Sequence, residues 1–110
     1  MIGGTEVRAN EMAATFAALG DPRRIAIIER LYEEEALSVS SLCEGMSVSR
    51  QAVSKHLKTL ADARLISVQK SGREMHYSLE ISRFEEANAF LVQVGAKWDH
   101  ALERLKTHVE

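Results

Sequence analysis

The chain has little of what builds disulfide-bonded, zinc-bound or membrane-spanning proteins. Its 110 residues include one cysteine, Cys43, so no disulfide can form within the chain. One cysteine also falls short of the roughly four ligands of a structural zinc site. No run approaches the roughly 20 apolar residues of a membrane helix, and residues 1–10 lack the apolar stretch of a secretory signal. We therefore expect a cytoplasmic protein that is stabilised by side-chain packing.

Proline is also scarce, and no repeat or linker divides the chain. Pro22 is the single proline. The length suits one compact domain over residues 1–110, with a modest apolar core. With 45% hydrophobic and 27% charged residues, the composition is that of a soluble globular domain.

Neither sign of charge is in large excess, but the charges are unevenly distributed. The formal net charge of −2 argues against a nonspecific nucleic-acid binder. Residues 47–76, however, hold six basic and two acidic residues, a net charge of +4, and the other 80 residues carry −6. A polyanion would be attracted to this one segment. The pattern predicts an oriented DNA-binding face.

Helical periodicity predicts two helices in the first third of the chain. Residues 9–19 carry apolar side chains on one face, and Gly20 supplies a stop. Asp21 and Pro22 start the second helix, since Asp caps free amides and Pro at the first helical position loses no needed hydrogen bond. This helix should run to about residue 34. Its expected inward residues are Ile25, Ile28, Leu31 and Tyr32, with Arg23, Arg30 and Glu33 left for solvent or partners.

Residues 40–64 are predicted to form two helices joined by a three- or four-residue turn. Ser40 or Ser41 can cap the first, which carries Leu42 and Met46, and the second starts at Arg50. A short turn followed by a basic helix is the helix-turn-helix arrangement, whose second helix enters the major groove. The expected inward residues of that helix are Ala52, Val53, Leu57 and Leu60, and those pointing elsewhere are Arg50, Gln51, Ser54, Lys55 and Lys58.

A β-hairpin and one long helix should complete the chain. Residues 65–69 and 75–79 alternate as strands do, around a polar tip at 70–74. Residues 82–109 carry apolar side chains at steps of three and four, and at 1.5 Å per residue this helix would run about 40 Å. A second copy of the chain is its natural cover, although an apolar effector pocket could share the seam. The expected dimer contacts are Met12, Phe16, Phe84, Leu91, Val94, Trp98, Leu102 and Leu105.

The order of these parts resembles the ArsR/SmtB family of bacterial repressors. Three strings carry the resemblance, LGDPRR at 19–24, SRQAVSKHL at 49–57 and ARLI at 63–66, and it covers roughly residues 16–79. It implies a mainly α fold with a small β-hairpin, a winged helix-turn-helix domain of about five helices and a two-stranded wing. The helix-turn-helix would occupy 40–64, the wing 65–79, and the dimerisation helices 9–19 and 82–109. The implied function is a homodimeric repressor that binds an inverted-repeat operator.

The metal ligands of many family members are missing at the matching positions. The familiar Cys-Val-Cys pair would fall on Ser38 and Ser40, whose hydroxyls are poor ligands for thiophilic metals. On the last helix, Asp99-His100 and His108-Val109-Glu110 do not match the family's spacings. We therefore expect no metal and no cofactor, and the sequence does not identify a small-molecule effector.

Gln51 and Ser54 are the candidates for base contacts, because amide and hydroxyl groups at the start of such a helix can address base edges. Ordinary surface polarity is the alternative. Phosphate contact is expected for Arg50, Lys55 and Lys58, although Arg50 or Lys55 could reach guanine. Ser49, as helix cap, presents free amides to a phosphate.

Three other residues have two interpretations each. His56 touches a phosphate or faces solvent. In the hairpin, Arg73 is expected in a minor groove with Lys70 on the backbone nearby, the alternative being solvated charge. Cys43 packs as a small hydrophobe or, in a thiol-responsive repressor, acts as a sensor.

Two other classes of function compete with a repressor. No catalytic constellation, phosphate loop or metal triad supports an enzyme. A winged helix that docks on protein instead of DNA is the remaining alternative, and the +4 segment argues against it.

Overall fold

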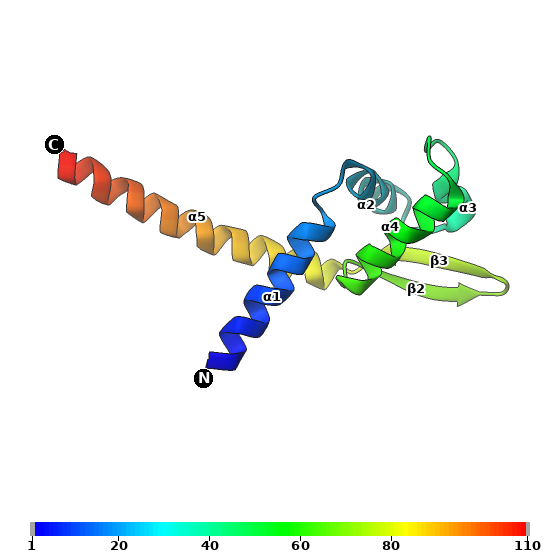
Figure 1. Ribbon diagram of the computed structural model, residues 1–110, viewed down its shortest axis with the longest axis horizontal. Coiled ribbons are helices and arrows are strands. Elements are labelled where there is room, and N and C mark those ends of the chain that lie inside the picture. The colour runs from blue at the N-terminus through cyan, green and yellow to red at the C-terminus, as the bar shows by residue number, and fades with distance from the viewer. Residues whose placement is uncertain (1, 110) are drawn as a thin grey trace.

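The computed structural model describes residues 2–109, and the side chains of residues 8–107. Figure 1 shows α2 to α4 and the sheet gathered at one end, with α5 projecting from them. Within the described residues this is the predicted winged helix-turn-helix architecture, with five helices and three strands. The elements are α1 (Ile2–Ala18), α2 (Pro22–Glu34), β1 (Ala36–Ser38), α3 (Val39–Cys43), α4 (Arg50–Asp62), β2 (Ile66–Ser71), β3 (Glu74–Leu79) and α5 (Ile81–Val109).

The two helices with the strongest start signals begin where the sequence predicts. At α2, the carboxylate of Asp21 accepts the backbone N–H of Arg23 at 2.8 Å, and Pro22 takes the first helical position. At α4, the hydroxyl of Ser49 accepts the backbone N–H of Ala52 at 3.1 Å. Each side chain satisfies one of the amides that a helix start leaves without a partner.

The short helix α3 differs from its prediction. Its cap is Ser38, whose hydroxyl accepts the backbone N–H of Ser41 at 3.2 Å, and not Ser40 or Ser41. The helix ends at Cys43, so six residues and not three or four separate it from α4, and Met46 lies in the turn. Gly45 in this turn has a φ of +80°, which glycine adopts without strain. With so few residues, α3 gives too weak a periodicity for the sequence to place its ends.

The wing belongs to a three-stranded antiparallel sheet, in the order β1-β3-β2. The strand β1 is absent from the prediction because three residues are too few for an alternating pattern to stand out. It pairs Leu37 with Tyr77 and so fastens α3 to the hairpin. The hairpin strands also reach further than predicted, since Ser71 pairs with Glu74 and only two residues, Gly72 and Arg73, form the turn.

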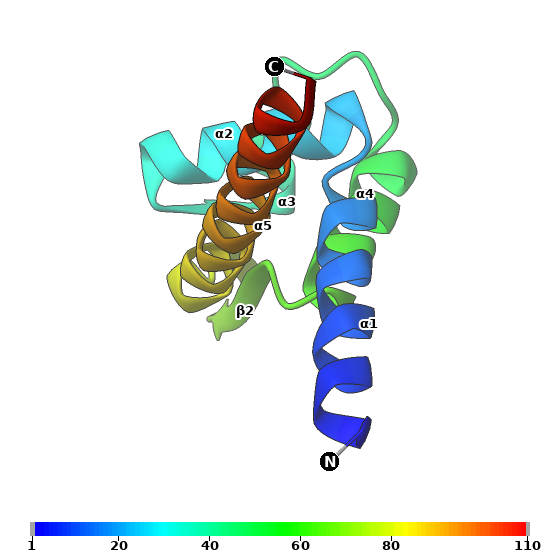
Figure 2. The same ribbon diagram turned by 90° about the vertical axis from the view of Figure 1, so that its left-hand side faces the viewer.

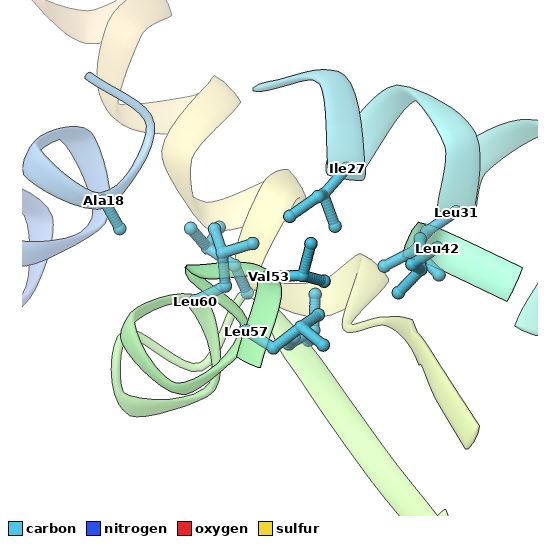
Figure 3. Packing of buried hydrophobic residues seen from close by; sticks show 9 residues of the cluster. Ala18, Ile27, Leu31, Leu42, Val53, Leu57 and Leu60 are labelled. Carbon is cyan, nitrogen blue, oxygen red and sulfur yellow. The ribbon is translucent and has the colours of Figure 1, made fainter. Parts of the chain in front are cut away.

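The apolar core lies between α2, α3, α4 and the start of β2 (Figure 3). On α4 the buried residues Val53, Leu57 and Leu60 confirm three members of the predicted inward stripe, whereas the fourth, Ala52, is only half-buried. On α2 the prediction is partly wrong, because Ile27 is fully buried while Tyr32 is 77% exposed. The fully buried large hydrophobic side chains are Ile27, Leu31, Leu42, Leu57, Leu60, Leu65 and Val53.

Helices α1 and α5 cross beside this core (Figures 1 and 2). The rings of Phe16 and Phe90 meet there at 5.9 Å between centroids. Met12 is only 3% exposed in the single chain, which removes it from the expected dimer contacts because it has no surface left for a partner. In Figure 1 the later part of α5 extends beyond all the other elements of the described chain. None of the described helices has both the length and the apolar character to cross a membrane.

We predict that Leu57→Ala lowers the free energy of unfolding by about 2–5 kcal/mol, because Leu57 is 1% exposed and its removal leaves a cavity. Urea unfolding at one fixed protein concentration measures the change. The exposed neighbour Thr59→Ala should change it by less than about 0.5 kcal/mol. Equal effects from the two substitutions would mean that this stripe of α4 is not in the core.

A second prediction concerns acid stability. The backbone N–H of Arg23 lowers the pKa of Asp21 below its ordinary value, so the ionised carboxylate stabilises the fold above that value. This contribution is lost as the pH falls through the lowered pKa of the folded protein. In Asp21→Asn the side-chain oxygen remains as a cap but does not titrate. Urea unfolding between about pH 2 and pH 6 should therefore show a flatter pH dependence for the variant; identical slopes would refute the assignment.

Candidate nucleic-acid interface

The outward face of α4 carries most of the predicted DNA contacts. Because Val53, Leu57 and Leu60 are held in the core, the opposite side of the helix must face solvent. An open groove of about 670 Å³ runs along it. Its lining consists of Ser49, Gln51, Ala52, Ser54, Lys55 and Lys58, which include five of the nine predicted DNA contacts.

Arg50 is exposed but turned toward the preceding helix. Its Nη1 donates to the hydroxyl of Ser40 at 3.2 Å, which links the first residue of α4 to α3. Arg50 therefore lies next to the groove without lining it. The hydrogen bond is exposed and easily exchanged for another acceptor, such as a phosphate oxygen.

Arg30 holds the far end of α3, whereas its place in the helical pattern predicts a residue left to solvent or partners. Its Nη1 donates to the backbone oxygens of Leu42 and Glu44, each at 3.0 Å. These carbonyls lie at the end of α3, where helical partners are lacking. The guanidinium also pairs with Glu34 of its own helix at 3.4 Å. Arg30 thus fastens the helix-turn-helix to α2, and no sequence pattern signals a partner 12 residues away.

His56 does not simply face solvent, which was one of its two predicted surroundings. It is half-buried, and its Nδ1 lies 3.5 Å from Nη1 of Arg24 on α2. Arg24 also donates to the backbone oxygens of Ala17 and Ala18 at the end of α1. The side chain of Arg24 therefore joins the end of α1, the start of α2 and the middle of α4, and it helps to set where α4 stands.

Lys58 is engaged within the chain. Its Nζ donates to Oδ2 of Asp62 at 3.0 Å, one helical turn further on. Both side chains are largely exposed, so solvent screens the pair and its contribution to stability is small. The carboxylate nonetheless competes with any phosphate for Lys58.

The hairpin carries the two remaining predicted contacts at and near its tip. Lys70 and Arg73 are exposed, and Arg73 follows Gly72, whose φ of +63° closes the turn. Figure 1 shows the hairpin extending beside α4, at the end of the molecule away from the C-terminus. The helix and the wing that carry these basic residues therefore lie at the same end of the fold.

The positions of the missing metal ligands have other roles. Ser38 is buried and caps α3, and Ser40 accepts from Arg50. Among the residues that the structure describes, no three His, Cys, Asp or Glu side chains gather where they could share a metal ion. The side chain of His108, and all of Glu110, lie outside the described residues.

The fold and this surface define a class: a winged helix-turn-helix protein of the DNA-binding type. Comparisons with known proteins lead to the same class. A family described as "Helix-turn-helix domain" matches residues 19–69. The arsenical resistance operon repressor of Bacillus subtilis is 36% identical over 76 residues, which cover 69% of this chain and 70% of the repressor. A transcriptional repressor SmtB homolog of Synechocystis is 40% identical over 72 residues, 66% of this chain and 54% of that protein.

Solved structures extend the similarity to almost the whole chain. An ArsR-like transcriptional regulator from Rhodococcus sp. RHA1 superposes with a TM-score of 0.83 at 36% identity, covering 93% of this chain and 95% of that one. The chain belongs to the ArsR/SmtB family of winged helix-turn-helix transcriptional regulators. This family is one of DNA-binding regulators and not of enzymes. The chain spans little more than half, 54–58%, of the length of three curated relatives that it matches.

Proposed function

We propose that this protein is a transcriptional repressor that binds an inverted-repeat operator as a homodimer, with one α4 in each half-site. The observation that carries the proposal is the polar, basic outward face of α4 on a winged helix-turn-helix. Such a helix fits the major groove, where each base pair presents a distinct pattern of donors and acceptors. The curated relatives named above are themselves repressors.

Within this interface we assign base reading to Gln51 and Ser54. Both are exposed, and both line the groove in the first two turns of α4. Lys55 and Lys58 contact phosphates from the same groove, and Ser49 offers the helix N-terminus to another phosphate. Lys70 and Arg73 hold the wing on the backbone and in the minor groove. His56 acts through its contact with Arg24, as a positioning residue for α4.

The long helix α5 supports a dimer. The chain extends 64 Å along its longest axis, and its radius of gyration is 18.0 Å, where a compact chain of this length would have about 13 Å. An apolar stripe on α5 is left in water, with Leu91 at 53%, Trp98 at 64%, Leu102 at 52% and Leu105 at 60% exposure. A twofold-related copy would cover this stripe with the same stripe. Phe16 and Phe84 are half-buried within the chain and would add only their remaining surface.

The two other candidate functions have weaker support. Cys43 is half-buried and packs against the core cluster. A reactive thiol is usually found in an exposed, electropositive environment instead. A protein-docking winged helix would have no need of a basic α4 and wing. We place the protein in the cytoplasm, where its operator would be.

Binding to the DNA upstream of its own gene tests the function. Fluorescence anisotropy with a labelled upstream fragment should show specific binding that weakens steeply between about 50 mM and 200 mM salt, because phosphate contacts release counterions. A scrambled fragment of equal length is the control. Equal affinity for both fragments, or no binding to either, would reject an operator-binding repressor in favour of a docking module.

Contact types in α4 can be separated by substitution. Gln51→Ala should relax the preference at one base position by about 1–3 kcal/mol, whereas Lys58→Ala should weaken binding to all sequences alike and flatten the salt slope. Asp62→Asn frees Lys58 from its ion pair and should instead raise affinity without changing preference. Anisotropy against single-base operator variants measures all three. An unchanged preference in Gln51→Ala would show that Gln51 does not read a base.

The dimer can be tested at Trp98. Trp98→Ala removes the largest exposed side chain of the apolar stripe, so sedimentation velocity should show a shift toward monomer at micromolar concentration. Lys97→Ala, at the neighbouring exposed position outside this stripe, should leave the dimer unchanged. A Trp98→Ala protein that sediments as the parent dimer would place Trp98 outside the interface.

A further inference from the structure

A second hollow lies beside α2, at the edge of the core. It has a volume of about 420 Å³ and is bounded by α2 on one side and by the end of β3 and the first turn of α5 on the other. From α2 it is lined by Ile28, Glu29, Tyr32 and Glu33. This volume falls within the usual range for small-molecule sites.

The walls of this hollow, which we call the α2–α5 groove, are apolar and aromatic. Leu79, Ile81 and Phe84 form the side opposite α2. Ile81 is 57% exposed and Tyr32 is 77% exposed, so apolar and aromatic surface faces water there in the single chain. Leu79, Phe84 and Ile28 also pack against the core cluster, which gives the groove a firm floor.

The charges at the α2–α5 groove are of one sign. Glu29 and Glu33 are one helical turn apart on α2, both are exposed, and neither is paired with a basic side chain in any ion pair that the structure shows among its described residues. No basic residue is among the lining residues. Two carboxylates beside an apolar groove attract a cation, and an exposed aromatic ring such as that of Tyr32 attracts the same charge.

We propose that the α2–α5 groove is an effector site for a small organic cation, with an apolar, aromatic body and one positive charge. The body packs on Ile28, Leu79 and Phe84, and the charge lies between the carboxylates of Glu29 and Glu33 and the ring of Tyr32. An anion of the same shape is repelled by the two carboxylates.

A small molecule fits this groove better than a second copy of the chain. Ile81 lies about 80° around α5 from Leu91, so the exposed wall of the groove lies to the side of the apolar stripe that we assign to the dimer. Phe84, about 20° from Leu91, is the wall at the edge of this stripe, and its side chain is half-buried against the core cluster. The most exposed residues of the groove, Ile81 and Tyr32, are outside the stripe of Leu91, Trp98 and Leu102.

The position of the α2–α5 groove gives its occupant a way to act on DNA, and this step rests on the proposed function. One wall is α2, which packs on α4 through Ile27 and Leu31, and the other is the start of the proposed dimer helix. An occupant that binds more tightly when α2 and the start of α5 are further apart shifts the protein toward that more open conformation. It thereby changes the separation of the two α4 helices, which a two-half-site operator requires to be about 34–36 Å.

Tetraphenylphosphonium and tetraphenylborate test the site, because they share a shape and differ in the sign of charge. Isothermal titration of the full chain, without DNA, should show binding of tetraphenylphosphonium and at least tenfold weaker binding of tetraphenylborate. No binding of the cation, or equal binding of both ions, would overturn the proposal.

Matched variants locate the binding. Glu29→Gln combined with Glu33→Gln should weaken tetraphenylphosphonium binding about fivefold to tenfold, since two exposed charge contacts are lost. Glu85→Gln combined with Glu103→Gln makes the same change of net charge away from the lining and should alter affinity less than about twofold. Equal weakening by both pairs would overturn the assignment to this groove.

Two further measurements complete the test. Tyr32→Ala should weaken tetraphenylphosphonium binding and leave the sedimentation of the dimer unchanged; a shift to monomer would assign the groove to the subunit interface and overturn the proposal. Saturating tetraphenylphosphonium should lower affinity for the upstream DNA, and an unchanged DNA affinity would overturn the regulatory role. If the chain does not bind DNA at all, the proposed function is wrong. The titrations without DNA still show whether the α2–α5 groove binds the cation.

Discussion

The burial of one face of α4 is the constraint on which the rest of the structure depends. Val53, Leu57 and Leu60 insert between α2, α3 and β2 and are almost completely removed from water. Burying three such side chains stabilises the fold by roughly 5–8 kcal/mol, far more than any exposed ion pair on the same helix. The rotation of α4 about its axis is therefore decided by the core. The face with Gln51, Ser54 and Lys55 points outward because the buried side chains hold the opposite face of the helix in the core.

Charged side chains then fasten the remaining elements around this core. Glu11 of α1 accepts from Arg64, which follows α4, at 3.3 Å, and pairs with Arg83 of α5 at 3.6 Å. Arg83 is only 6% exposed, so its charge needs these carboxylates, and Glu86 supplies a second one at 3.2 Å. Through this network the helix proposed to form the dimer is connected to the end of the helix proposed to read DNA. A repressor needs such a connection if a movement of α5 is to change the position of α4 and thereby the affinity for the operator.

The sequence predicts most of the fold because its local signals agree with one another. The caps at Asp21 and Ser49 are confirmed, and so is the inward stripe of α4 except for Ala52. The prediction fails where several faces of an element are apolar or where an element is very short. On α2, Ile27 and Tyr32 compete for the inward face, and only packing against α4 decides between them. The candidate site is less predictable, since the partners of Arg24, Arg30 and His56 lie up to 32 residues away and leave no periodic trace.

The sequence by itself determined the helix-turn-helix, the hairpin, the family and the long apolar stripe of α5, because these depend on residue spacing and on contacts close along the chain. Only the tertiary structure decided which polar residues are free to meet a ligand. It turned Arg50 toward Ser40, set His56 against Arg24 and enclosed Met12, while it left Gln51, Ser54 and Lys55 exposed. It also brought Glu29 and Glu33 beside Phe84, more than 50 positions further along the chain, to form the α2–α5 groove. Contacts between residues so far apart in the sequence follow from the packing of whole helices and strands, and no local sequence pattern predicts them.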